Sequence, residues 1–180
     1  MLLKRTYQFL IFFTLSSILL SCSHLNKFGQ RRVNFNLERI KPNTDKLAYE
    51  IIDTSKLYKK VDIKNTFDSS KNMEFNRLNN LNPEYLKFYE KGKVGKFNNV
   101  SVDKIETLNP QKAESYLYNF KNNTFTVQVY FKNPQCGECF IKGKLEKISK
   151  DTIQIVSGDY IETYKAIDIP KSFLIYKPDW

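Results

Sequence analysis

The sequence predicts a mainly β domain, arranged as an antiparallel meander or a partly open small barrel with one or two short helices. Aromatic residues make up 14% of the 180 residues, and aromatic and β-branched side chains fit the half-buried face of a pleated sheet. Runs of such residues recur in the second half of the chain. Short polar turns such as Ser149-Lys150-Asp151 and Ser157-Gly158-Asp159 separate them, which is typical of hairpin-connected strands.

The composition excludes several other classes of protein. Hydrophobic residues are 41% and charged residues 27% of the chain, which is typical of a globular protein. Six glycines and six prolines are too few for a low-complexity chain. The formal net charge of +10 favours anionic partners, although the simpler interpretation is a solvated lysine surface. No run of five or more basic residues occurs, so we expect no nucleic-acid partner.

The first half of the predicted domain contains short elements. Leu47–Ile52 and Leu57–Ile63 have β character, and one short helix is predicted around Met73–Leu78 within a loop rich in Asn, Ser and Asp. Tyr85–Tyr89 and Val94–Phe97 flank a turn that contains Lys91-Gly92, which predicts a hairpin.

The second half predicts further hairpins. Asn109-Pro110 is a good helix start, and the apolar residues of 113–120 fit helical spacing. The competing interpretation is one helical turn followed by a strand that turns at Lys121-Asn122-Asn123 into Thr124–Phe131, and we favour this hairpin. Three later strands complete the expected meander: Phe140–Ile148, Thr152–Val156 and Tyr160–Ile169.

Residues 1–21 predict a signal peptide. Lys4 and Arg5 precede Phe9–Leu20, an uncharged and mostly apolar stretch that is shorter than the ~20 residues of a membrane-spanning helix. Leu19-Leu20-Ser21-Cys22 resembles the lipobox of bacterial lipoproteins. The resemblance implies cleavage before Cys22, a diacylglycerol on its sulfur and a fatty acyl chain on its amine, which together hold a protein stably on a membrane. The alternative is an ordinary secretory leader with an incidental Cys22.

Residues 22–45 predict a basic tether that leads to a single β-rich domain of residues 46–180. Basic residues alternate with asparagines here, and each basic residue near an anionic membrane contributes ~1 kcal/mol of attraction. The expected partners are the membrane, through lipid on Cys22, and anionic lipid or lipopolysaccharide. Ser23 favours the outer membrane, facing the periplasm. His24 is the only histidine, and its place in the tether excludes histidine-dependent acid–base chemistry.

Cys136-Gly137-Glu138-Cys139 is the one motif with candidate chemistry. As a structural disulfide it would close a very short loop, which stabilises the fold by only ~2 kcal/mol. As half of a zinc site it lacks further Cys or His ligands, so we expect no metal and no cofactor. As a redox pair, with Cys136 as nucleophile and Cys139 as resolving thiol, it resembles the thioredoxin active site.

The thioredoxin resemblance has support and departures. The strand Val127–Phe131 precedes the motif, and apolar residues of 141–148 follow it at helical spacing. A helix N-terminus lowers a thiol pKa, and Ile169-Pro170 resembles the Ile–cis-Pro element of that family. Against it, Gly143 interrupts the expected helix, and the ten residues after Pro170 are too few for the end of that fold.

Two elements, Tyr85–Val94 and Ile169–Trp180, resemble parts of small bacterial envelope lipoproteins of unknown function. The resemblance implies a β domain behind a lipid tether and assigns no site. We therefore expect a membrane-anchored envelope lipoprotein with a non-catalytic binding or structural role for an unassigned ligand. A thioredoxin-like thiol–disulfide oxidoreductase that uses Cys136 and Cys139 is the alternative.

Overall fold

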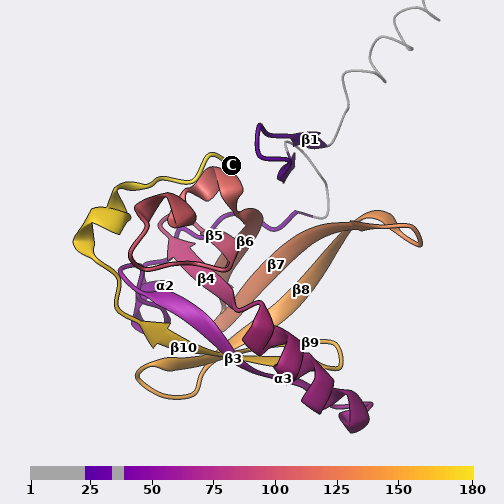
Figure 1. The fold of residues 1–180 in the computed structure, drawn as a ribbon. Coiled ribbons are helices and arrows are strands. Elements are labelled where there is room, and N and C mark those ends of the chain that lie inside the picture. The colour runs from indigo at the N-terminus through magenta and orange to yellow at the C-terminus, as the bar shows by residue number, and fades with distance from the viewer. Residues whose placement is uncertain (1–22, 34–38) are drawn as a thin grey trace, which may run out of the picture.

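The domain is an eight-stranded antiparallel barrel that closes on itself (Figure 1). The computed structural model describes residues 23–33 and 39–180. Each barrel strand pairs with the next one along the chain, and the last strand returns to the first. The predicted mainly β, antiparallel fold is confirmed, and the sheet continues round to full closure.

The barrel strands follow in chain order: β3 (Leu57–Asn65), β4 (Glu84–Tyr89), β5 (Lys93–Asn98), β6 (Glu114–Lys121), β7 (Thr124–Asn133), β8 (Gly137–Lys147), β9 (Thr152–Ser157) and β10 (Tyr160–Ile167). A separate two-stranded hairpin precedes the barrel: β1 (Ser23–Leu25) and β2 (Arg31–Val33). The helical elements are short: α2 (Ala48–Ile51), η1 (Ser69–Lys71), α3 (Asn72–Leu81), η2 (Ile105–Leu108), η3 (Pro110–Lys112) and η4 (Lys171–Ile175).

Most of the predicted elements are confirmed, including the two central hairpins and the helix around Met73–Leu78. After Asn109 the chain makes one 3-10 turn, in which the Asn109 Oδ1 accepts a hydrogen bond from the Gln111 N–H at 3.0 Å. The chain then enters β6. Asn122 and Asn123, with φ of 52° and 57°, form the two-residue turn into β7, because a type I′ hairpin turn needs positive φ at both positions.

The prediction of β structure at Leu47–Ile52 is wrong, because residues 48–51 form the helix α2. The Asp45 carboxylate accepts a hydrogen bond from the Leu47 N–H at 2.9 Å, which favours a helical turn at this point. Ala48 is the first residue of the helix, and Ile52 caps its end, donating its N–H to the Ala48 carbonyl at 3.1 Å. Both are buried in the aromatic core of the barrel.

Residues 22–45, expected as a tether, pack on the barrel where the structure describes them. The Ile40 N–H donates to Gln128 Oε1 at 2.7 Å. Asn43 is buried, and its N–H donates to the Tyr118 carbonyl at 3.1 Å. Its side-chain oxygen accepts from the Phe120 N–H at 3.0 Å. These bonds fix the chain before α2 along strand β6.

Two hydrophobic clusters lie on the two faces of β4. Inside the barrel, Phe88 contacts the rings of Tyr58, Tyr118 and Phe125 edge-on at centroid distances of 5.3 to 6.4 Å. The opposite face of β4 is covered by the loop after β5 and by the C-terminal segment, which form a second cluster of buried residues: Leu57, Tyr85, Phe97, Leu108, Ala113 and Phe173. Because both faces are covered, every residue from Tyr85 to Tyr89 is buried, including Lys87.

The turn between β4 and β5 depends on Gly92. Its φ is +77°, and a Cβ atom there would lie 2.1 Å from the Asn43 nitrogen and 2.7 Å from the Tyr118 carbonyl oxygen. These atoms are backbone, so they cannot move aside as a flexible side chain would. The Gly92 carbonyl also accepts a hydrogen bond from the Tyr118 N–H at 2.8 Å. The glycine therefore allows the chain before α2 to pack against the turn.

We predict that Gly92→Ala destabilises the protein far more than Gly158→Ala. Gly158 also has a positive φ, of +56°, but a Cβ there has no neighbour within 4 Å. Both variants pay roughly 1–2 kcal/mol for the left-handed backbone, so the difference between them measures the backbone clash. Urea unfolding midpoints of the two variants check this, and equal losses of stability would contradict the proposed packing.

Candidate functional site

A cleft lies outside the barrel, beside the β4–β5 turn. It has a volume of about 510 Å³, within the range of small-molecule sites. Three parts of the chain line it: the loop before β3, the end of β4 with the turn into β5, and the C-terminal segment. The lining residues are Thr54, Ser55, Lys87, Phe88, Tyr89, Glu90, Lys91, Lys93, Leu174, Tyr176, Lys177 and Pro178.

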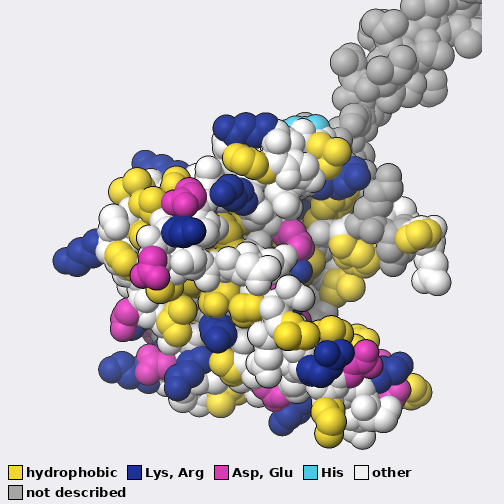
Figure 2. All heavy atoms as spheres, viewed as in Figure 1, with side chains coloured by type: hydrophobic (Ala, Val, Ile, Leu, Met, Phe, Trp, Pro, Cys, Tyr) yellow, Lys and Arg dark blue, Asp and Glu magenta, His cyan; other side chains and the backbone are white. Residues whose placement is uncertain are grey.

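The cleft has a cationic side and an apolar side. Lys87, Lys91, Lys93 and Lys177 line it together with a single carboxylate, that of Glu90. Aromatic and aliphatic side chains of Tyr89 and the C-terminal segment supply the rest of the wall. Figure 2 shows Lys and Arg spread over the visible face among acidic side chains.

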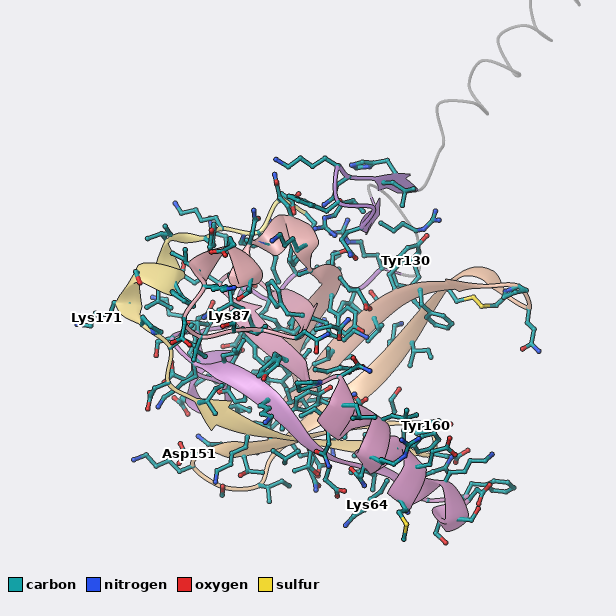
Figure 3. The ribbon with its side chains drawn as sticks, in the orientation of Figure 1. Lys64, Lys87, Tyr130, Asp151, Tyr160 and Lys171 are labelled. Carbon is teal, nitrogen blue, oxygen red and sulfur yellow. A yellow bond between two sulfur atoms is a disulfide. The ribbon has the colours of Figure 1, made fainter. Side chains whose placement is uncertain are left out.

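Lys87 is the most unusual residue of the cleft. Its side chain lies within the body of the molecule, whereas Lys64 and Lys171 project at the periphery (Figure 3), and the residue is only 4% exposed. The ammonium donates a hydrogen bond to the Thr54 carbonyl and lies 5.6 Å from the centre of the Tyr89 ring. Burial lowers the pKa of Lys87 to about 8, against a smaller opposing effect of Asp53.

The neighbouring groups respond to the same environment. Burial lowers the pKa of Lys93, and the positive charges of Arg39 and Lys91 lower it further, against an opposing effect of Asp179. Burial raises the pKa of Tyr89, and Asp179 adds to this shift. The cleft therefore concentrates positive charge at a partly desolvated site, and an anion bound there would relieve the repulsion among the lysines.

The cleft lysines are not neutralised by salt bridges. Among the described residues, none of Lys87, Lys91, Lys93 and Lys177 forms an ion pair with a carboxylate. Lysines elsewhere in the domain do: Lys56 pairs with Asp168 at 2.7 Å. Exposed lysines such as Lys59 also lack an ion pair within the described chain, so what distinguishes the cleft is that several unpaired lysines line one concave site and that one of them, Lys87, is buried.

The barrel interior, in contrast, holds a charge network that is already satisfied. The Lys60 ammonium lies 2.5 Å from both Glu84 and Glu162. Lys96 continues the network, with its ammonium 3.1 Å from Glu114. Two phenols join it, Tyr116 donating to Glu114 and Tyr164 to Glu162. Burial alone would lower the pKa of Lys60, but the two carboxylates outweigh it and raise the pKa.

The cleft lining includes none of the predicted site residues that the structure describes. Cys22 lies outside the described residues. Cys136 and Cys139 form a disulfide, with a Cα–Cα distance of 6.1 Å, at the tip of the long β7–β8 hairpin (Figure 3). The helix expected after Cys139 is absent, because Gly137–Lys147 is strand β8. The redox interpretation therefore lacks the helix N-terminus that would lower the pKa of a thiol. None of the cleft residues lies near Cys136 and Cys139 in the sequence.

Sequence reasoning missed the lysines of the cleft. A signal for one of them exists: Lys87 stands in Tyr85-Leu86-Lys87-Phe88-Tyr89, a lysine between bulky apolar residues of a strand. Lysine is rarely buried without a partner, so such a position is a candidate for function. Lys177, ninety residues later, lines the same cleft only because of how the C-terminal segment packs.

Within the described residues no cluster of three or more His, Cys, Asp or Glu has the arrangement of a metal site.

We predict that Lys60→Met destabilises the protein by up to roughly 3–5 kcal/mol at neutral pH. The change leaves the half-buried carboxylate of Glu162 without its cation and that of Glu84 with only Lys96, at 3.9 Å. The exposed Lys59 on the same strand is the control, and Lys59→Met should change stability by less than ~0.5 kcal/mol. Urea unfolding measures both, and equal effects would show that the network is not required.

The contact between Lys60 and Glu84 also predicts that the stability of the protein depends on pH. Burial would raise the pKa of Glu84, but Lys60 and Lys96 outweigh it, so the pKa is lowered from 4.5. The stability that Glu84 contributes is therefore present above its unfolded pKa and is lost as the pH falls through its folded pKa. The difference in the free energy of unfolding between the wild type and Lys60→Met should therefore become smaller at acidic pH, which urea unfolding at several pH values measures.

The chain was compared with protein-family models, curated proteins and solved structures. No protein-family model, no curated protein and no solved structure matches the chain. In the part of the chain that the structure describes, no helix has the length and apolar character to cross a membrane. The geometry and charge of the cleft are therefore the basis for assigning a role to the domain.

Proposed function

We propose that this protein is a lipid-anchored binding protein of the bacterial cell envelope, and that its cleft binds a small organic anion without catalysing a reaction on it. One observation carries the proposal. Four lysines line a concave site, and within the described residues none of them has a salt-bridge partner. A cleft that concentrates unpaired cations is built to receive negative charge.

The walls of the cleft restrict the class of ligand. The lysines supply charge-assisted hydrogen bonds to a carboxylate, sulfonate or phosphate group. Tyr89, Leu174, Tyr176 and Pro178 supply an apolar surface for the rest of the molecule. An amphiphilic anion of modest size satisfies both sides, whereas a fully apolar ligand would leave the lysines desolvated without compensation.

The chemistry of the lining supports binding rather than catalysis. The lining residues include no Cys or His, and their one carboxylate, Glu90, is exposed. General acid–base catalysis needs a positioned pair of groups with matched pKa values. Lys87, with its pKa of about 8, lacks such a partner in the lining, so its amine serves best as a charged donor to the ligand.

The location in the envelope follows from the leader. Leu19-Leu20-Ser21-Cys22 resembles a lipobox, and the residues before it have the charge and length of a signal peptide. Lipid on Cys22 would hold the cleft close to the membrane, where amphiphilic anions partition. The outer membrane, facing the periplasm, remains the expected site because Ser follows Cys22.

We predict that anilinonaphthalene sulfonate, a fluorescent aromatic anion, binds the wild type and binds Lys87→Met at least roughly tenfold more weakly at neutral pH, since one charge-assisted hydrogen bond contributes ~1.5–3 kcal/mol. The affinity of the wild type should fall as the pH rises past about 8, because Lys87 loses its charge there. The variant should lack this step. Fluorescence titration measures both.

Lys59→Met is the matched control, because Lys59 is an exposed lysine that does not line the cleft. Its affinity for the probe should equal that of the wild type. If Lys87→Met and the wild type bind the probe equally well across the pH range, the cleft is not the anion site and the proposed function fails.

We also predict that Cys22→Ala releases the protein from membranes. Without the cysteine no acyl chain is attached, and hydrophobic anchoring of ~0.8 kcal/mol per buried CH₂ is lost. Fractionation of cells that express the wild type or the variant, with mass spectrometry of the N-terminal peptide, checks this. A Cys22→Ala chain that still sediments with membranes would contradict the lipid anchor.

A further inference from the structure

We infer that the β1–β2 hairpin is the surface on which this domain rests against an anionic bilayer, with Leu25 and Phe28 at the lipid interface. The inference rests on the proposed lipid at Cys22 and adds an orientation to it. Cys22 immediately precedes Ser23, the first residue of β1. Consecutive Cα atoms are about 3.8 Å apart, so lipid on Cys22 would bring the hairpin to the membrane surface.

The hairpin is fixed to the barrel through Arg32. Its guanidinium donates to the carbonyls of Ala113 and Pro110, each at 2.9 Å, and pairs with Asp179 at 3.2 Å. It also stacks on the Trp180 ring at 4.7 Å. The Arg32 side chain is almost fully buried by these contacts. The hairpin is therefore held by both the segment just before β6 and the C-terminus.

The turn of the hairpin is held as well. Asn26 donates from its side chain to the Gln111 carbonyl at 2.6 Å. Its side-chain oxygen accepts from the N–H groups of Phe28 and Gln30 at 2.9 and 3.0 Å. These bonds order the turn and set the direction of its exposed side chains. The hairpin therefore transmits its orientation to the whole domain.

The exposed side chains of the hairpin suit a membrane interface. Leu25 is 60% and Phe28 41% exposed. Two ammonium groups lie over the Phe28 ring, that of Lys27 at 5.2 Å and that of Lys112 at 5.8 Å. Apolar and aromatic side chains among lysines are typical of segments that lie in the headgroup region of anionic membranes.

The opposite end of the molecule provides the contrast. Helix α3 lies at the far end from β1 in Figure 1, and its Met73 is 84% exposed. No anchoring residue adjoins it in the sequence. If the hairpin rests on the bilayer, α3 faces away from it, and a reporter on α3 measures the aqueous environment.

The test uses the lipidated chain purified from membranes and reconstituted in vesicles of phosphatidylethanolamine and phosphatidylglycerol. Leu25→Cys, Phe28→Cys and Met73→Cys each add one free thiol for an NBD fluorophore, since Cys136 and Cys139 are joined as a disulfide. All three positions are exposed. Nitroxide-labelled lipids should quench most of the fluorescence at positions 25 and 28 and little at position 73.

The charges are tested by adding Lys27→Glu and Lys112→Glu to the Leu25→Cys reporter. Quenching should fall in the anionic vesicles and stay unchanged in phosphatidylcholine vesicles. A mass that shows unmodified Cys22 would overturn the lipid anchor and, with it, the role of the hairpin. Lipidated Cys22 with positions 25 and 28 quenched no more than position 73 would overturn the orientation alone.

Discussion

The charge balance around Lys60 holds the barrel together where its backbone pairing is weakest. Strands β3 and β4 share only two paired positions, Tyr58 with Leu86 and Lys59 with Tyr85. Lys60 on β3 reaches Glu84 on β4 and Glu162 on β10, so one side chain joins three strands at this seam. A buried cation with two carboxylates is stable only if all three are present. Closure of the barrel thus depends on polar contacts as well as on the aromatic core.

This arrangement also explains why the candidate site lies outside the barrel. An eight-stranded barrel has an interior just wide enough to be filled by side chains or to hold one small ligand. Here the rings around Phe88 and the network around Lys60 occupy it. The lysines inside are paired, and those of the outer cleft are not. The same residue type therefore serves closure in one place and is available for a ligand in the other.

The C-terminal segment connects the proposed ligand site to the proposed membrane surface. Leu174 and residues 176–178 form one wall of the cleft. The next two residues, Asp179 and Trp180, hold Arg32 of the hairpin. Trp180 also meets Tyr89, a cleft residue, edge-on at 6.2 Å. The hairpin and the cleft are therefore packed on the same short stretch of chain.

Local patterns in the chain were sufficient for the mainly β class, the hairpins at Lys91-Gly92 and Asn122-Asn123, and the helix within 72–81, because strand alternation and turn chemistry act over a few residues. They failed at Leu47–Ile52, where residues 48–51 form a short helix and Ala48 and Ile52 fill the barrel core. The lipobox resemblance at Cys22 likewise comes from contiguous residues alone. The cleft, in contrast, is formed by residues that lie far apart in the sequence. Lys87 and Lys177 come together only because the C-terminal segment covers the outer face of β4. The low pKa of Lys87 then follows from burial, a property of the packed molecule that no local pattern contains.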